Sequence, residues 1–251
     1  MKKCTKLVHL MANYILFIFE GDKTEKQIFE SLQKHYLNEF KNTILIASYG
    51  THIYKLFREV EKDPDLDLFT LIKERSSDTQ ITKISRDLVS EIFLFFDYDG
   101  HVSGATSDIL FEMLKHFDEE TERGKLYISY PMVEAIKHLK SSVDYRDTVV
   151  KCDRNYKNTV SKNCDICYEK LTTISKQNWG NIVSENSKKL NFIVNGIFDF
   201  PKQLHPIVQF EVFENQLNKF INPLDKVAVL SSFPIFLLDY YGYRKLPTLI
   251  Q

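Results

Sequence analysis

The sequence is poor in the residues that interrupt regular structure, with 8 glycines and 7 prolines among 251 residues. Long flexible linkers rich in glycine or proline are therefore excluded. Hydrophobic residues make up 43% of the chain and charged residues 27%, a balance that predicts a buried core and argues against disorder. The length suits one large domain, or a catalytic domain with an appended module.

An excess of positive charge is also lacking, because the formal net charge is −1. A protein that coats nucleic acid is usually basic, so any contact with nucleic acid must be local. The longest apolar runs, residues 14–19 and 92–96, are too short to span a bilayer. No apolar signal-peptide stretch follows the basic N-terminus. We therefore expect a cytoplasmic protein without membrane contact.

Cysteines are few, and only Cys164 and Cys167 form a CxxC pair, with Cys152 twelve residues before it. A structural zinc site needs four ligands, usually as two such pairs. Free thiols in a reducing cytoplasm are therefore the favoured interpretation. Zinc held by these three cysteines stays an open alternative.

Four apolar runs alternate with helical patterns in the first part of the chain, at residues 14–19, 43–47, 92–96 and 125–129. This alternation is typical of a parallel sheet flanked by helices, the α/β class. Thr24 is a candidate N-cap, with Gln27 completing a capping box, for a helix that runs to about Phe40. Pro131 is expected to open another helix over 132–139. Further helices are predicted over 53–60, over 66–90 with a break at 76–78, and over 109–117.

The strand signal fades after residue 141. We therefore predict a catalytic domain over 1–141 and a mainly helical accessory module over 142–251. Residues 151–162 are basic and contain Tyr156, a combination that suits either a groove for single-stranded nucleic acid or an ordinary polar loop. The apolar stretch 231–242 is expected to pack in the core.

Carboxylates follow two of the predicted strands. Glu20 ends the first, and Asp97 and Asp99 end the third. The carboxyl ends of parallel strands share one edge of the sheet, where such folds bind ligands. Residues two apart on an extended chain point the same way, so both aspartates can face this edge while Tyr98 points away. Three converging carboxylates repel one another unless a cation joins them, and Mg²⁺ prefers such oxygen ligands.

Together these motifs resemble the Toprim fold of bacterial primases, topoisomerases and OLD-family nucleases. That family carries a glutamate after its first strand and a DxD after its third. Residues 20–25 (EGDKTE) are especially similar to the opening of Toprim proteins from phage-defence systems, namely the RloB-like proteins and the Toprim subunit of PARIS. Residues 129–134 (SYPMVE) resemble their NPxxE-type segment. The resemblance covers about residues 12–140.

The resemblance implies a nuclease that uses Mg²⁺ or Mn²⁺. Glu20 would be a general base or metal ligand, and Asp97 and Asp99 would bind the metal. Glu134 would be a further acidic member by its position. Topoisomerases and primases often have a third aspartate where this chain has His101, and this difference favours a nuclease.

Related defence proteins work with an ATPase. This chain has no phosphate-binding GxxxxGK[ST] loop, so the resemblance implies a separate ATPase partner and a role as an antiviral effector. A homo-oligomer is also compatible with the sequence.

Four basic side chains are candidate contacts for the nucleic acid: Lys23, Lys26, His101 and Lys137. For Lys23 and Lys26 the ordinary alternative is a solvated first turn of a helix. For Lys137 it is a surface helix in which Glu and Lys alternate. For His101 it is a cap on the turn after the DxD.

Two other functions fit parts of the pattern. Asp97, Asp99 and Gly100 match the DxDG of haloacid-dehalogenase-type phosphatases, but that family usually has threonine where His101 stands, and it gives Glu20 no role. The other is a catalytically silent Toprim-like subunit that regulates an ATPase. Such a subunit would not need three clustered carboxylates, and it should bind little metal.

Overall fold

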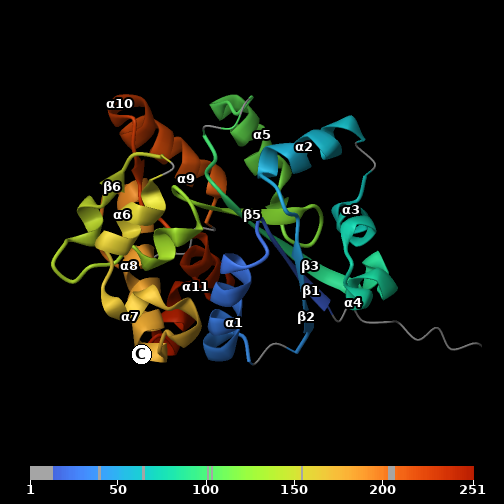
Figure 1. The fold of residues 1–251 in the computed structure, drawn as a ribbon, viewed down its shortest axis with the longest axis horizontal. Coiled ribbons are helices and arrows are strands. Elements are labelled where there is room, and N and C mark those ends of the chain that lie inside the picture. The colour runs from blue at the N-terminus through green and yellow to red at the C-terminus, as the bar shows by residue number, and fades with distance from the viewer. Residues whose placement is uncertain are drawn as a thin grey trace, which may run out of the picture.

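The central sheet has five strands, in the order β2-β1-β3-β5-β4 (Figure 1). The computed structural model describes residues 14–38, 41–63, 66–100, 102, 104–153, 155–202 and 207–251. Strands β1, β2, β3 and β5 are parallel, and only β4 is antiparallel to its neighbour. The predicted α/β class is thus confirmed. The strands are β1 Tyr14–Phe19, β2 Thr43–Ser48, β3 Val89–Asp97, β4 Asp118–Glu119 and β5 Gly124–Ser129.

One face of the sheet is built from phenylalanine rings. The ring of Phe17 lies 4.3 Å from that of Phe29 in α1 (Thr24–Tyr36). The rings of Phe95 and Phe233 are stacked at 4.7 Å, and Phe236 also packs on this face. Phe233 and Phe236 belong to α11 (Ser232–Leu249), near the C-terminus of the chain. The stretch 231–242 that was expected in the core therefore covers the two central strands.

Helices from the first half of the chain cover the other face. At Gly124 of β5, an added Cβ would lie 2.7 Å from the Leu94 side chain of the neighbouring strand β3 and 3.3 Å from Leu68 in the helical layer. Leu68 begins α3 (Leu68–Arg75), and α4 (Thr79–Lys83) follows after the break predicted at 76–78. The layer also contains α2 (Ile53–Lys62) and α5 (Ser107–His116). The sheet is therefore covered on both faces, as a parallel sheet requires.

Four local predictions are wrong. Thr24 is the first helical residue of α1 and not its N-cap, a position that Lys23 occupies without a side-chain cap. The helix ends at Tyr36, before the predicted end at Phe40, which lies outside the described residues. Pro131 follows a cis peptide bond, and only a 3₁₀ helix (Val133–Lys137) comes after it in place of the expected α-helix. The predicted helix over 66–90 is also interrupted near its end, where a 3₁₀ turn leads into β3.

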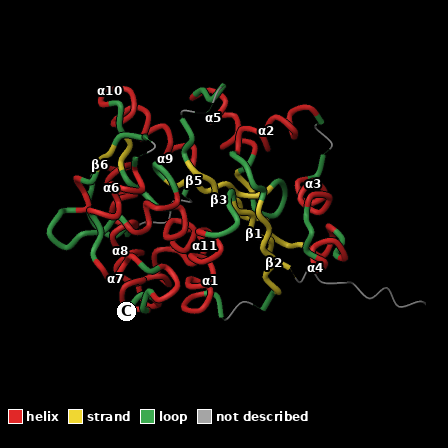
Figure 2. Tube along the Cα trace, in the orientation of Figure 1, coloured by secondary structure: helices red, strands yellow, loops and turns green. Residues whose placement is uncertain are grey.

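The second half of the chain is mainly helical, as predicted (Figure 2). Its elements are α6 Tyr156–Lys162, α7 Ile166–Glu169, α8 Lys176–Asn195, α9 Gln209–Gln216, a π-helical turn over 217–221, α10 Asn222–Leu224 and α11, with a small ladder between β6 Val149–Val150 and β7 Val227–Ala228. Trp179 of α8 donates a 2.8 Å hydrogen bond to Ser31 of α1. The two halves thus share contacts, and a domain division at residue 141 stays a prediction. Within the described residues, no helix is long and apolar enough to cross a membrane.

A buried lysine ties the connection before β6 to α8. Lys189 is fully buried. Its ammonium group donates to the carbonyl oxygens of Tyr145 (3.1 Å), Arg146 (2.5 Å) and Thr148 (3.1 Å). An ammonium group has three N–H donors, and here each of them meets an acceptor.

Candidate functional site

The sheet extends one residue beyond β1 and thereby places Glu20. The Glu20 N–H donates to the carbonyl oxygen of Phe95 at 3.1 Å, and the Glu20 carbonyl accepts from the Gly50 N–H at 2.9 Å. The residue is therefore held between β3 and the loop after β2, at the carboxyl edge of the sheet. Its half-buried carboxylate projects from a rigid backbone.

Asp97 is the last residue of β3 and lies next to Glu20. Its backbone N–H donates to Glu20 Oε2 at 3.2 Å, which links two residues 77 positions apart. On the other side, Asp97 pairs with Ser129 of β5, and the next N–H, that of Tyr98, donates to the Ser129 carbonyl at 3.0 Å. Asp99 lies two residues further along the chain, and its charge adds to the effect of burial in raising the pKa of Glu20. The structure thus brings Glu20 and Asp97 into contact and places Asp99 within electrostatic influence of Glu20.

A fourth carboxylate comes from the first turn of α1. Glu25 is only 7% exposed, and its Oε1 accepts a 3.1 Å hydrogen bond from the Gly21 N–H. A Cβ on Gly21 would lie 2.9 Å from the other carboxylate oxygen of Glu25. The glycine after Glu20 therefore allows the Glu25 carboxylate to approach the backbone closely.

Glu134 supplies a fifth carboxylate, from the 3₁₀ helix after Pro131. It is 8% exposed, and its Oε1 lies 3.0 Å from Lys157 Nζ of α6. Its other oxygen, Oε2, is buried, and among the described residues nothing hydrogen-bonds to it. A buried carboxylate oxygen without a donor is costly, so this atom has capacity for a cation or a proton.

The five side chains affect one another electrostatically. Burial raises the pKa of Glu20 to about 7, and the charges of Asp99 and Glu25 add to this effect. Burial also raises the pKa of Asp97 well above its usual range, helped by Glu20, Glu25, Glu134 and Asp99. Glu20, Glu25, Asp97, Asp99 and Glu134 are called the acidic cluster below. Mutual repulsion of this kind is relieved by protonation or by a cation.

The donor chemistry of the acidic cluster fits a hard divalent cation, because every donor is a carboxylate oxygen. Two further observations agree with a cation site: Glu134 Oε2 has no hydrogen-bond partner among the described residues, and the pKa of Glu20 is raised. Across the described ranges, however, no three His, Cys, Asp or Glu side chains converge closely enough to hold an ion as they stand. The residues that would hold the cation are Glu20, Asp97 and Asp99, and their carboxylates would have to draw together around it.

The predicted basic contacts lie in different places. Lys23 is exposed, and Lys26 is paired at 3.2 Å with exposed Asp22. The charge of Lys137 acts on Cys164 and lowers its pKa against the larger raising effect of burial. The 3₁₀ helix that carries Glu134 and Lys137 is largely buried and not a surface helix, since four of its five residues, 133–136, are buried. His101 lies outside the described residues.

Three residues near the site were not assigned to the acidic site from the sequence. Glu25 stands inside the EGDKTE segment, so its motif was the available signal. Lys157 was noted only as part of the basic segment 151–162, whose Tyr156 proves to be buried and cannot line a groove. Cys152 lies beside the DxD, with Sγ 3.5 Å from the Tyr98 carbonyl oxygen, and has different neighbours from Cys164 and Cys167.

Comparison with known proteins gives no match: no protein-family model, no curated protein and no solved structure is significantly similar to this chain.

Proposed function

We propose that this chain is a Mg²⁺- or Mn²⁺-dependent nuclease of the Toprim type that cleaves phosphodiester bonds in DNA or RNA, transfer RNA included. The observation that carries the proposal is the acidic cluster at the carboxyl edge of the sheet, where the Asp97 N–H donates to Glu20 Oε2. Neither carboxylate is neutralised by an ion pair within the described residues, although both are buried enough to have raised pKa values. Structural carboxylates usually have such partners.

The chemistry assigned to the cluster divides among its members. Asp97 and Asp99 would hold the cation together with Glu20. When bound, the cation would offset the negative charge of the phosphodiester and make a water a better nucleophile. As an alternative to binding the cation, Glu20 would act as the general base that accepts a proton from the attacking water. Lys157 pairs with Glu134 at 3.0 Å, where it would balance charge next to the substrate.

The wider biological role is proposed from the resemblance of residues 20–25 and 129–134 alone. In this role the nuclease is an antiviral effector that an ATPase partner restrains until infection. The nearly neutral net charge agrees with local recognition of the substrate and not with coating of nucleic acid.

The test is cleavage of plasmid, single-stranded DNA and total transfer RNA by the purified chain with Mg²⁺ or Mn²⁺. We expect Glu20→Gln and Asp97→Asn to lower the cleavage rate by about a hundredfold or more. The matched controls are Glu30→Gln, on the exposed side of α1, and Asp118→Asn, on exposed β4 at the opposite edge of the sheet. Both should cleave like the wild type. Equal cleavage by all five proteins would refute the assignment.

The two alternatives are decided in the same experiment. A haloacid-dehalogenase-type phosphatase would hydrolyse p-nitrophenyl phosphate, and it would depend on Asp97 but not on Glu20. A catalytically silent subunit would show neither activity and no heat of Mn²⁺ binding in calorimetry. The contact between Glu20 and Asp97 favours the nuclease over the phosphatase, since that contact makes Glu20 part of the site.

A further inference from the structure

Helix α6 is fixed against the element that carries Glu134. Its Tyr156 and Val160, one helical turn apart, are buried, at 1% and 3% exposed. The Tyr156 hydroxyl lies 3.0 Å from Nδ1 of His138, which directly follows the 3₁₀ helix that carries Glu134. One side of α6 is therefore packed beside the acidic cluster, and the position of its other side relative to the cluster is set by this packing.

The outer side of α6 is polar and basic. Its exposed side chains are those of Lys157, Asn158, Ser161 and Lys162. The helix contains no Asp or Glu, so this side has two positive charges and no negative charge from α6 itself. Lys140 brings a third ammonium group to the far end, where it donates to the Lys162 carbonyl oxygen at 3.2 Å. These five residues are called the basic face below.

The basic face begins at the acidic cluster and leads away from it. Lys157 Nζ lies 3.0 Å from Glu134 Oε1, and its side chain is 66% exposed. The contact with Glu134 raises the pKa of Lys157, and the charges of Asp97 and Glu25 add to this effect, so the ammonium group stays charged. With three N–H donors, it can keep Glu134 and also donate to a phosphate oxygen. Lys162 follows about 7.5 Å further along the helix.

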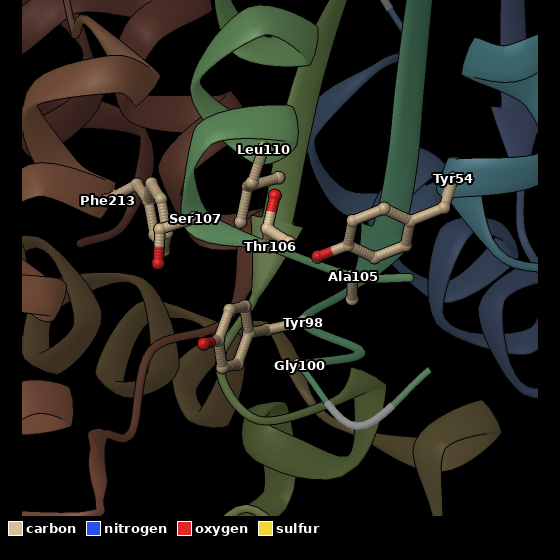
Figure 3. Close-up of a pocket in the computed structure, with 8 residues that line it drawn as sticks. All are labelled: Tyr54, Tyr98, Gly100, Ala105, Thr106, Ser107, Leu110 and Phe213. Carbon is tan, nitrogen blue, oxygen red and sulfur yellow. The ribbon is translucent and has the colours of Figure 1, made fainter. Parts of the chain in front are cut away.

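Other surfaces around the DxD loop lack this charge. A pocket of about 190 Å³ lies beside the loop, between α2, α5 and α9 (Figure 3). None of the described residues that line it carries a charge, and the rings of Tyr54 and Phe213 in its wall are buried. On α1, Lys26 is already paired with Asp22 at 3.2 Å. The basic face therefore complements a polyanion better than these surfaces do.

We propose that the basic face binds the phosphodiester backbone of the substrate strand, next to the bond that the acidic cluster cleaves. This inference rests on the proposed nuclease function and states where the strand lies, but binding can be measured without cleavage. Lys157 and Lys162 would pair with phosphates of the strand, and Asn158 and Ser161 would donate hydrogen bonds to their oxygens. Contacts to phosphate carry no sequence information, so the basic face would position the strand without selecting its sequence.

The experiment is fluorescence anisotropy of a labelled single-stranded oligonucleotide of mixed sequence, as DNA and as RNA. The full chain is titrated in EDTA at several salt concentrations. Lys157→Gln combined with Lys162→Gln removes both charges of α6. Lys62→Gln combined with Lys83→Gln is the matched control, because these exposed lysines of α2 and α4 lie over the other face of the sheet and the same charge is lost.

We expect the control to bind like the wild type. The α6 double variant should bind about tenfold more weakly at about 0.1 M salt, and its plot of log affinity against log salt should be shallower by about 1.4, from two lost phosphate contacts. Lys162→Gln alone, which keeps the pair between Lys157 and Glu134, should make the plot shallower by about 0.7. This single variant separates binding of the strand from balance of charge at the cluster.

Three results would overturn the inference: no binding of either oligonucleotide by the wild type, equal weakening by the control pair, or a salt dependence that the α6 variants leave unchanged. Thermal unfolding of each variant shows that it is folded. Weaker binding by the α6 variants together with no cleavage by the wild type would sustain the basic face and reject the nuclease. Cleavage that depends on Glu20 and Asp97, with the same Michaelis constant in Lys162→Gln as in the wild type, would do the reverse.

Discussion

The molecule buries charge in two places, in opposite ways. Around Lys189, one amine group donates to three carbonyl oxygens, and burial lowers the pKa of this lysine to about 7. In the acidic cluster, carboxylates gather with Lys157 as the nearby countercharge, and one oxygen of Glu134 has no described donor. A buried polar group whose hydrogen bonds are complete is costly to remove, whereas carboxylates that repel one another gain stability when one of them is neutralised. Replacement of Lys189 should therefore lower the free energy of unfolding, and neutralisation of Glu20 should raise it near neutral pH.

Replacement of Lys189 should give the largest change in stability. Lys189→Met keeps most of the buried side chain but leaves three carbonyl oxygens without a donor. We expect the free energy of unfolding to fall by about 3 kcal/mol. Lys188→Met is the matched control, because Lys188 is partly exposed and paired with Glu185 at 2.7 Å, and it should cost less than about 1 kcal/mol. Urea unfolding measures both, and equal losses would contradict the structural role of Lys189.

The pH dependence of stability should reveal the acidic cluster. The pKa of Glu20 is about 7 in the folded chain against 4.5 as its ordinary value, so the folded state binds more protons and stability falls as pH rises between these values. His138, whose pKa burial and Lys189 lower to about 4, opposes this trend. The useful quantity is therefore the difference between wild type and Glu20→Gln.

Relative to the wild type, Glu20→Gln should gain about 2 kcal/mol between about pH 5.5 and about pH 7.5. Urea unfolding at both pH values gives this quantity, with Glu30→Gln as the control that should track the wild type. A constant difference between wild type and Glu20→Gln would mean that Glu20 titrates normally and that the cluster is not under repulsion.

Divalent ions should have a smaller stabilising effect. At about tenfold excess over the dissociation constant, Mg²⁺ or Mn²⁺ should add about 1.4 kcal/mol to the stability of the wild type, because only the folded chain assembles the ligands. Asp97→Asn should remove this gain, and Asp118→Asn should keep it. Thermal unfolding with and without the ion measures the effect, and the prediction fails if Asp97→Asn is stabilised as much as the wild type.

The smallest effect is expected from Lys157. Its ammonium group pairs with Glu134 at 3.0 Å, but the side chain is 66% exposed, so solvent weakens the interaction. Lys157→Met should cost less than about 1 kcal/mol without divalent ions. It should also leave the acidic cluster more negative and so increase the stabilisation by Mn²⁺. A decrease in that stabilisation would show that Lys157 supports the cation site and does not compete with it.

The sheet and the meeting of Glu20 with Asp97 could be predicted because both depend on local patterns. Apolar runs such as 14–19 and 92–96 identify buried parallel strands, and parallel strands bring their carboxyl ends to one edge. Glu25 and Lys157 could not be placed in the same way. The approach of Glu25 depends on the absence of a side chain at Gly21, and that of Lys157 depends on how α6 packs.

Two further features could not be predicted from the sequence, for a different reason. A cis peptide bond before Pro131 cannot be read from the proline itself, so the short 3₁₀ helix that carries Glu134 was predicted as an α-helix. Lys189 looked like any other lysine of a polar segment, because its three acceptors come from a connection about forty residues earlier.

The position of α11 also affects how the chain is made. Phe233 and Phe236 complete the cover over the rings of Phe17, Phe93 and Phe95, and the ribosome adds these two residues long after it has made β1 and β3. Until then, a nascent chain exposes aromatic rings of β1 and β3 to solvent, close to the carboxylates of Glu20 and Asp97. This face of the sheet is therefore completed late in synthesis.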